Sequence, residues 1–383
     1  MWFMLRKALL TLFCFILFAM LYPGQADGKT PGVSAQSAAL IDQSSGRLLY
    51  GKNSHEKLPI ASITKVMTAI LAIESGKMNK RTTVSAEAIR TEGSSIYLKA
   101  GEKIKLRDLV YGLMLRSGND ASRAIAEAVG QSEQGFVFMM NEKAKEIGMT
   151  DTHFTNPNGL ENTDHYSSAY DMALLTRYAM QHPLFRKIVG TRIYRAAPDN
   201  KSEARVWGNK NKMLKQYKYA TGGKTGFTKA AGRTLISTAT KGKMDLIAVT
   251  LNDGDDWVDH RNLFEWGFQT FKNIQVVRKG RLHADVSKFY KNKIFVKRSM
   301  QLPLTTDEKR SFTKKLILLA PPKSKKGWTP PEPTGRILIT VHGEKLGSLP
   351  VYYQQGKPTK KGFWSAVRGF FGAIISGEGA DNP

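Results

Sequence analysis

The sequence is poor in cysteine, since Cys14 carries the only thiol in 383 residues. This residue lies inside the apolar N-terminal stretch 8–22. If that stretch is removed, the remaining chain has no disulfide and no thiol nucleophile. The stretch is also shorter than the roughly 20 apolar residues that a membrane-spanning helix needs.

The N-terminal segment has the order of a secretory signal. Arg6 and Lys7 precede the apolar stretch, and small residues follow it in Pro23-Gly24-Gln25-Ala26. We therefore predict a signal peptide over residues 1–26 that is cleaved after Ala26, with an uncleaved anchor as the alternative. Export without disulfides favours a bacterial envelope over a eukaryotic secretory route.

Acidic residues are also scarce, because 32 Asp and Glu stand against 58 Lys and Arg, for a formal net charge of +26. Such an excess either keeps the protein soluble or favours an anionic partner, such as a membrane surface or a nucleic acid. The basic run Lys323-Ser324-Lys325-Lys326 is too short to indicate nucleic-acid binding. We expect no nucleic-acid partner.

The pattern of apolar residues predicts an α+β fold. A β-hairpin over 37–50 precedes a series of helices, three strands between 222 and 251, and a closing helix over 259–271. This order favours an antiparallel sheet flanked by helices over a doubly wound parallel sheet. We expect the catalytic domain to span residues 33–274.

The composition changes after residue 274, where 21 Lys and Arg stand against 7 Asp and Glu up to the C-terminus. Short alternating apolar runs separated by prolines predict a small β-rich domain over residues 275–353. The segment 354–383 places Phe363, Val367, Phe370, Phe371 and Ile374 on one helical face beside Lys360 and Lys361. We predict that it is an amphipathic tail lying on an anionic membrane surface; packing against the β domain is the alternative.

The most informative stretch is Ala61-Ser62-Ile63-Thr64-Lys65, which we expect to form the first turns of a buried helix that ends near Ser75-Gly76. Ser62 and Lys65 are three residues apart and would share a helical face. A desolvated lysine can take the proton of a serine hydroxyl, because burial lowers the pKa of its ammonium group. Ser-x-x-Lys also occurs at Ser54/Lys57 and Ser311/Lys314, but only the Ser62 copy opens a long apolar helix.

Two further motifs follow in the same order along the chain. Ser117-Gly118-Asn119 is the only Ser-x-Asn, and Lys224-Thr225-Gly226 is the only Lys-[Ser/Thr]-Gly. Each tripeptide alone is a weak signal, whereas the ordered set of three is a strong one. The chain resembles the penicillin-interactive serine enzymes, and the blocks 116–121, 156–160, 165–173 and 223–228 resemble the low-molecular-mass D-alanyl-D-alanine carboxypeptidases of the peptidase S11 family. Residues 90–94 and 111–120 look similar to the sporulation-associated branch of Bacillus-like bacteria.

The resemblance implies a role for each motif residue. Ser62 attacks the carbonyl, and Lys65 accepts its proton. Ser117 bridges Lys65 to the leaving nitrogen and relays a proton to it, and Asn119 fixes Lys65 and the substrate amide. Lys224 and Thr225 bind the substrate carboxylate, Gly226 allows close approach of the substrate, and the N–H groups of Ser62 and Phe227 form the oxyanion hole. The expected substrate is a peptidoglycan stem peptide ending in D-Ala-D-Ala, with β-lactams as covalent inhibitors. The expected place is the outer face of the cytoplasmic membrane or, in the sporulation branch, the forespore envelope.

Three alternatives remain from the sequence. A class A β-lactamase would need a glutamate to activate the deacylating water, and its Glu-x-x-Leu-Asn block is absent between Asn119 and Lys224. A DD-endopeptidase of the same fold and a non-catalytic envelope scaffold are the other two. The histidines lack metal-binding spacing, so we expect no metal and no cofactor, and a structural hydrogen-bonding role for His165.

Overall fold

The computed structural model describes residues 30–196, 204–322 and 328–354. The chain divides into two compact units, Met1–Phe271 and Lys272–Pro383. This division lies three residues before the predicted boundary at residue 274. The predicted signal peptide and the predicted amphipathic tail lie outside the described residues.

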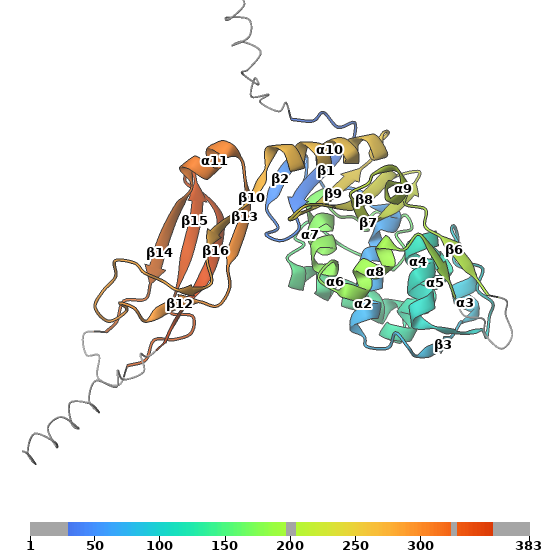
Figure 1. The fold of residues 1–383 in the computed structure, drawn as a ribbon. Coiled ribbons are helices and arrows are strands. Elements are labelled where there is room, and N and C mark those ends of the chain that lie inside the picture. Colours follow the sequence, from blue (N-terminus) through green and yellow to red (C-terminus); the bar gives the residue numbers. More distant parts are fainter. Residues whose placement is uncertain (1–29, 197–203, 323–327, 355–383) are drawn as a thin grey trace, which may run out of the picture. The chain divides into compact units, whose positions relative to one another are not determined.

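The first unit is built on an antiparallel sheet in the order β2-β1-β9-β8-β7 (Figure 1). The predicted α+β fold, an antiparallel sheet flanked by helices, is therefore confirmed. Its strands are β1 (Ser37–Asp42), β2 (Leu48–Lys52), β7 (Ala220–Thr228), β8 (Gly232–Lys241) and β9 (Met244–Leu251). Two small ribbons, β3 (Arg81–Thr83) with β4 (Lys103–Lys105) and β5 (Ile193–Arg195) with β6 (Val206–Gly208), lie outside this sheet.

Each face of the sheet packs against its own apolar cluster, because successive side chains of a strand alternate between the two faces. Leu40 and Ile41 pair with Ala248 and Ile247 of β9, and all four side chains are buried. Leu40 belongs to the apolar cluster that includes Leu263 and Phe264 of α10 (Asp256–Thr270), whereas Ile41 belongs to the larger cluster on the opposite face. Successive side chains of a strand point to opposite faces, so the same strand supplies both cores.

The helices between residues 65 and 190 contribute to the apolar cluster on the opposite face, whereas the short helix at 213–216 places Met213 in the cluster that α10 covers. Their bounds are α2 (Lys65–Glu74), α3 (Ala86–Ile89), α4 (Leu106–Arg116), α5 (Asn119–Gly130), α6 (Glu133–Ile147), α7 (Ala169–Ala179), α8 (Pro183–Gly190) and α9 (Met213–Gln216). Ser62 lies in the short 3-10 helix η1 (Ala61–Thr64) that precedes α2, and not in the α-helix itself.

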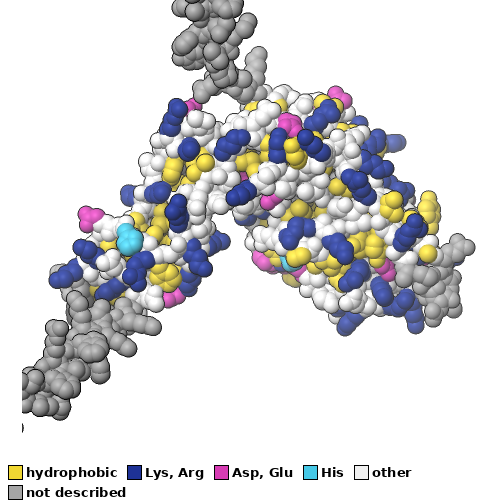
Figure 2. Space-filling model, in the orientation of Figure 1, with side chains coloured by type: hydrophobic (Ala, Val, Ile, Leu, Met, Phe, Trp, Pro, Cys, Tyr) yellow, Lys and Arg dark blue, Asp and Glu magenta, His cyan; other side chains and the backbone are white. Residues whose placement is uncertain are grey.

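The second unit is mainly β-structure around its own apolar core. One sheet has the order β11-β12-β16-β15-β14, and β10 pairs with β13. The elements are β10 (Lys272–Val277), β11 (Gly280–Arg281), β12 (Ile294–Val296), β13 (Met300–Leu304), α11 (Thr306–Ser311), β14 (Thr313–Leu318), β15 (Gly335–Val341) and β16 (Glu344–Tyr353). Figure 2 shows Lys and Arg side chains outnumbering acidic ones on the displayed face of each unit. In the part of the chain that the structure describes, no helix is both long and apolar enough to cross a membrane.

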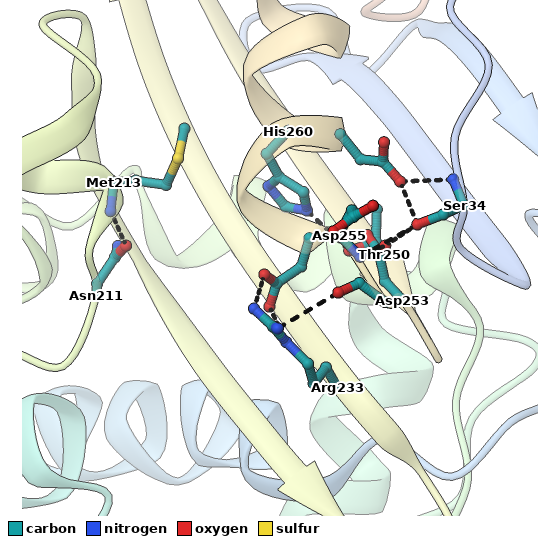
Figure 3. A network of polar contacts seen from close by, with 11 residues as sticks. Ser34, Asn211, Met213, Arg233, Thr250, Asp253, Asp255 and His260 are labelled. Atoms are coloured by element: carbon teal, nitrogen blue, oxygen red, sulfur yellow. Dashed lines mark hydrogen bonds and ion pairs between the residues drawn. The ribbon is translucent and has the colours of Figure 1, made fainter.

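A partly buried polar network joins the segment before β1 to α10 (Figure 3). The Ser34 hydroxyl lies 2.7 Å from Asp253 Oδ1 and 2.9 Å from Asp259 Oδ2, and the Ser34 N–H donates to the same Asp259 oxygen. His260 follows Asp259 in α10, and its Nε2 lies 3.0 Å from the Thr250 hydroxyl. Hydrogen bonds of this kind offset the cost of burying polar groups between sheet and helix.

His260 should make the protein less stable in acid. Its complete burial lowers the pKa of the imidazole to about 3, whereas the unfolded chain protonates it near pH 6.5. Between these values the unfolded state binds the extra proton, so the free energy of unfolding falls as the pH falls. We expect His260→Gln to flatten the decrease of Tm between pH 7 and pH 4.

Comparing the variant with the wild type isolates the imidazole. Burial raises the pKa of Asp253, which acts on stability in the opposite direction but titrates in both proteins. An identical dependence of Tm on pH in the two proteins would show that His260 does not contribute.

Candidate active site

Ser62 lies in a strained turn that the surrounding chain holds in place. Ala61, the preceding residue, has a φ of +49°, a left-handed conformation that costs a non-glycine residue of order 1–3 kcal/mol. The Ile60 carbonyl accepts a 3.0 Å hydrogen bond from the Thr234 hydroxyl of β8, and the Ala61 carbonyl accepts one of 2.8 Å from Thr64. The sheet and the turn itself therefore fix the backbone on the N-terminal side of Ser62.

His165 supports the same turn through a directed chain of hydrogen bonds. Its Nδ1 accepts from the Thr155 N–H at 3.0 Å, which leaves Nε2 as the donor to the Thr64 hydroxyl at 2.8 Å. Thr64 in turn donates to the Ala61 carbonyl. Burial, the largest cause, lowers the pKa of His165 to about 4, so the neutral ring that this chain requires is stable near pH 7. The predicted structural role of His165 agrees with this geometry.

Lys65 is fully buried at the start of α2 and directed at Ser62. Its Nζ lies 2.8 Å from Ser62 Oγ and 2.5 Å from the Asn158 carbonyl oxygen. Burial lowers the pKa of Lys65 well below its ordinary value, and the positive charges of Lys224 and Lys210 lower it further. A lysine with a lowered pKa beside a hydroxyl can act as a general base.

The contact from Asn158 was not predicted, although its block 156–160 carries part of the family resemblance. This loop packs tightly under the Ser62 turn, because a Cβ on Gly159 would lie 1.9 Å from the Ala61 carbonyl oxygen. The Pro157 carbonyl accepts hydrogen bonds from Thr68 of α2 and Ser122 of α5. A backbone carbonyl leaves no side-chain signature, so residue types could not reveal that Asn158 binds Lys65.

Ser117 ends helix α4 in a left-handed conformation, with a φ of +66°. Its hydroxyl lies 3.1 Å from Lys224 Nζ. The resemblance implied a bridge from Ser117 to Lys65, but the hydrogen bond in the structure joins it to the other buried lysine. Ser117 is thereby brought to the edge strand β7.

Asn119 begins helix α5 and is held against the loop 92–94. Its backbone N–H donates to the Ser94 carbonyl at 2.6 Å, and its Nδ2 donates to the Glu92 carbonyl at 2.5 Å. The implied hydrogen bond between Asn119 and Lys65 is not formed. Its Oδ1 is buried and accepts no hydrogen bond from the described residues. This oxygen is therefore free to accept one from a substrate.

Lys224 lies on β7 with its ammonium group buried. Nζ bonds to Ser117 Oγ and, at 2.5 Å, to the Thr225 carbonyl. Burial lowers the pKa of Lys224 to about 7, and the charge of Lys210 acts in the same direction. An anion bound here would raise this pKa and hold the lysine in its charged form.

Gly226 allows β7 to lie directly against the Ser62 turn. A Cβ at this position would lie 2.4 Å from Thr234 Oγ1 and 2.9 Å from the Ser62 backbone nitrogen. The protein's own packing therefore requires this glycine, in addition to the implied approach of a substrate. Phe227 follows with a side chain that is 66% exposed, so a role for its backbone N–H does not depend on burial of the ring.

Carboxylates and metal ligands do not gather at this site. Among the residues that the structure describes, no carboxylate hydrogen-bonds to Ser62 or Lys65, and no group of three or more His, Cys, Asp or Glu could hold a metal ion. Glu161, the acidic residue of the nearby loop, accepts a hydrogen bond from the Ala230 N–H instead. The geometry supports chemistry carried by serine and lysine.

Lys210 is not one of the motif residues, but its charge should affect the pH dependence of the reaction. Its charge lowers the pKa of both Lys65 and Lys224, so Lys210→Gln should raise both values. If the reaction needs neutral Lys65 and charged Lys224, both limbs of the pH profile of kcat/KM should move to higher pH. Lys212→Gln is the control, because this exposed lysine acts on Asp256 instead; a profile that Lys210→Gln leaves in place would contradict the assignment.

Comparison with known proteins agrees with this arrangement. The family model described as peptidase S11, D-alanyl-D-alanine carboxypeptidase, matches residues 25–255. The chain is 32% identical to D-alanyl-D-alanine carboxypeptidase DacF of Bacillus subtilis over 91% of its own length and 93% of that protein. It is also 32% identical to DacC of Escherichia coli, over 70% of this chain and 69% of the relative.

Solved structures match as well. Penicillin binding protein 5 from Haemophilus influenzae superposes with a TM-score of 0.72 at 25% identity, covering 85% of this chain and 98% of that one. D-alanyl-D-alanine carboxypeptidase from Mycobacterium tuberculosis gives 0.61 at 30% identity, over 64% of this chain and 95% of that one. These matches show that the chain belongs to the peptidase S11 family of D-alanyl-D-alanine carboxypeptidases.

Proposed function

We propose that this protein is a serine D-Ala-D-Ala carboxypeptidase that removes the terminal D-alanine from peptidoglycan stem pentapeptides through an acyl-enzyme on Ser62. The observation that carries the proposal is the 2.8 Å contact between Ser62 Oγ and the buried Lys65 Nζ. Burial lowers the pKa of Lys65 well below its ordinary value, which favours the neutral amine that can take the Ser62 proton.

In the first step, Ser62 Oγ attacks the carbonyl carbon between the two D-alanines and its proton passes to Lys65 Nζ. The charge that develops on the carbonyl oxygen is stabilised by the N–H groups of Ser62 and Phe227, which belong to the turn and the strand that Gly226 brings together. When the C–N bond breaks, Ser117 donates a proton to the departing D-alanine amine and is resupplied from Lys65 or Lys224. Water then hydrolyses the ester, which restores the Ser62 hydroxyl and releases the shortened peptide.

Two residues bind the C-terminal carboxylate of the substrate in this scheme. The Lys224 ammonium group and the Thr225 hydroxyl are assigned to this carboxylate, and the bound carboxylate keeps Lys224 charged. Asn119 orients the peptide upstream of the cleaved bond, since its buried Oδ1 can accept a substrate N–H. A free terminal carboxylate is therefore part of the recognised structure.

β-Lactams enter the same path as inhibitors, because their strained amide acylates Ser62. The described part of the site places no carboxylate against Ser62, which favours a persistent acyl-enzyme over β-lactamase turnover. A DD-endopeptidase would use the same residues on a cross-linked peptide. A scaffold without activity would have no use for a buried lysine aimed at a serine.

The location follows from the same assignment. A protein that acts on stem peptides works in the cell envelope, and the residues 1–26 are proposed to export it. The segment 354–383 is proposed to bind the anionic outer face of the cytoplasmic membrane. We extend the proposal to the forespore envelope because residues 90–94 and 111–120 resemble the sporulation-associated branch. A chain lacking residues 360–383 should no longer sediment with membranes; unchanged sedimentation after signal cleavage would contradict the membrane role.

The direct test is product analysis with two substrates. With a soluble stem pentapeptide the protein should release one equivalent of D-alanine and leave the tetrapeptide. With a cross-linked stem-peptide dimer it should release little or no monomer. Cleavage of the dimer in preference to the pentapeptide would identify a DD-endopeptidase, and no cleavage of either would exclude the proposed activity.

A further inference from the structure

A cationic pocket adjoins the proposed site on the side of Asn119. It has a volume of about 710 Å³ and its wall is hydrogen-bonded to that residue. The Ser94 carbonyl accepts from the Asn119 N–H, and a Cβ on Gly93 would lie 2.8 Å from Asn119 Nδ2. The pocket is lined by Gly93, Ser94, Ser95, Ile96, Tyr97, Arg116, Arg205, Val206, Trp207, Gly208 and Lys210.

The charge of the pocket is unbalanced. Three of the lining side chains are cationic and none is acidic. Arg205 is paired with the buried Glu102, but among the described residues neither Arg116 nor Lys210 forms an ion pair. Lys210 Nζ has only a long contact of 3.5 Å with the Ser94 hydroxyl, and the Arg116 charge lowers the pKa of Lys210. Two like charges that face one pocket without a counter-ion favour binding of an anion.

The loop that forms one wall is fixed in place by a buried carboxylate. Asp120 accepts hydrogen bonds from the Ser95 hydroxyl and from the N–H groups of Ile96 and Leu98. This arrangement holds Tyr97 at a φ of +60° with its side chain 83% exposed. A non-glycine residue keeps such a conformation only where its surroundings hold it, so the pocket wall is held in place before any ligand arrives.

The pocket also has an apolar surface beside its cationic side chains. Ile96 and the buried Trp207 line it beside Arg116 and Lys210. An aliphatic stem lies well on such a surface, while a carboxylate at its end reaches the two cations. The chemistry is that of an acidic side chain several carbons long.

We infer that this pocket is a subsite for the carboxylate at the end of the side chain of the residue that precedes the D-alanine pair in the stem peptide. The inference rests on the proposed function and adds the chemical class of the third residue. Asn119 is bonded through its N–H to Ser94 of the pocket wall, and its Oδ1 is the acceptor proposed for a substrate amide. A side chain next to that amide would therefore lie near the pocket that Arg116 lines. The terminal carboxylate, by contrast, is assigned to Lys224 and Thr225 on β7.

Two short peptides test the inference with the full chain. One is Nα-acetyl-L-α-aminoadipyl-D-Ala-D-Ala, and the other carries the side-chain amide in place of the carboxylate. We expect kcat/KM for D-alanine release to be about tenfold higher for the acid, as one favourable charged contact allows. Arg116→Gln should reduce this ratio toward one, and Arg116→Lys should keep part of it. Lys210→Gln is the second variant and should also reduce the ratio.

The matched control is Arg261→Gln, on the exposed side of α10, which should keep the wild-type ratio. Equal rates of the wild type on the two peptides would overturn the subsite, and so would an Arg116→Gln protein that slows both peptides by the same factor. Release of no D-alanine from either peptide by the wild type would instead overturn the proposed function.

Discussion

Replacing Ser62 with alanine should reduce D-alanine release by at least about 10³-fold, because the acyl-enzyme cannot form without the hydroxyl. Alanine fits the 3-10 turn, whose backbone is held by Thr234 and by Thr64 rather than by the serine side chain. The variant should therefore fold, with a Tm close to that of the wild type. The measurement is D-alanine release from a stem pentapeptide at saturating substrate.

The chain supplies its own matched control for this variant. Ser311 begins another Ser-x-x-Lys sequence, at the end of the short helix α11 in the second unit. Ser311→Ala should leave the rate unchanged. A Ser62→Ala protein that still releases D-alanine at a comparable rate would refute the assignment of the nucleophile.

Replacing Lys65 with methionine should have an effect of similar size. Methionine keeps most of the volume in this fully buried position but cannot take the Ser62 proton. Lys65→Arg separates two roles, since a guanidinium remains protonated and supplies charge without acting as a base. Both variants should lose at least about 10³-fold in kcat, measured by D-alanine release and by the rate of acylation with a β-lactam.

The control for Lys65 is Lys314→Met, the lysine of the same Ser311 sequence, which should behave as the wild type. Activity retained by Lys65→Arg would mean that the lysine acts through its charge and that another group takes the proton. In the wild type, the rate should fall as the pH drops through the lowered pKa of Lys65.

Much of the fold could be predicted because the spacing of apolar residues along the sequence indicates which face of a strand or helix is buried. The strand 37–42 was expected from its apolar run and is β1, and the runs 233–240 and 244–251 lie within β8 and β9. The short ribbons β3–β4 and β5–β6 were missed, since strands of three residues carry too few side chains for a pattern. Ser62 was expected in an α-helix, but it lies in a 3-10 turn. This turn begins with Ala61 in a left-handed conformation and packs against β7.

The motifs predicted which residues belong to the site, but they did not predict the hydrogen bonds among them. Ser62 is bonded to Lys65 as expected, but Ser117 is bonded to Lys224 and Asn119 to the Glu92 carbonyl. The second ligand of Lys65 is the Asn158 carbonyl. Backbone contacts and the choice between two neighbouring lysines depend on tertiary geometry, to which residue types are insensitive.

The most direct measurement is the intact mass of the protein after incubation with a penicillin, followed by mapping of the adduct. The account predicts one penicilloyl group, on the peptide that contains Ser62, which persists long after free penicillin is removed. It also predicts no adduct in the Ser62→Ala protein. An adduct on another residue, or one that is lost within a single fast turnover as in a β-lactamase, would contradict it.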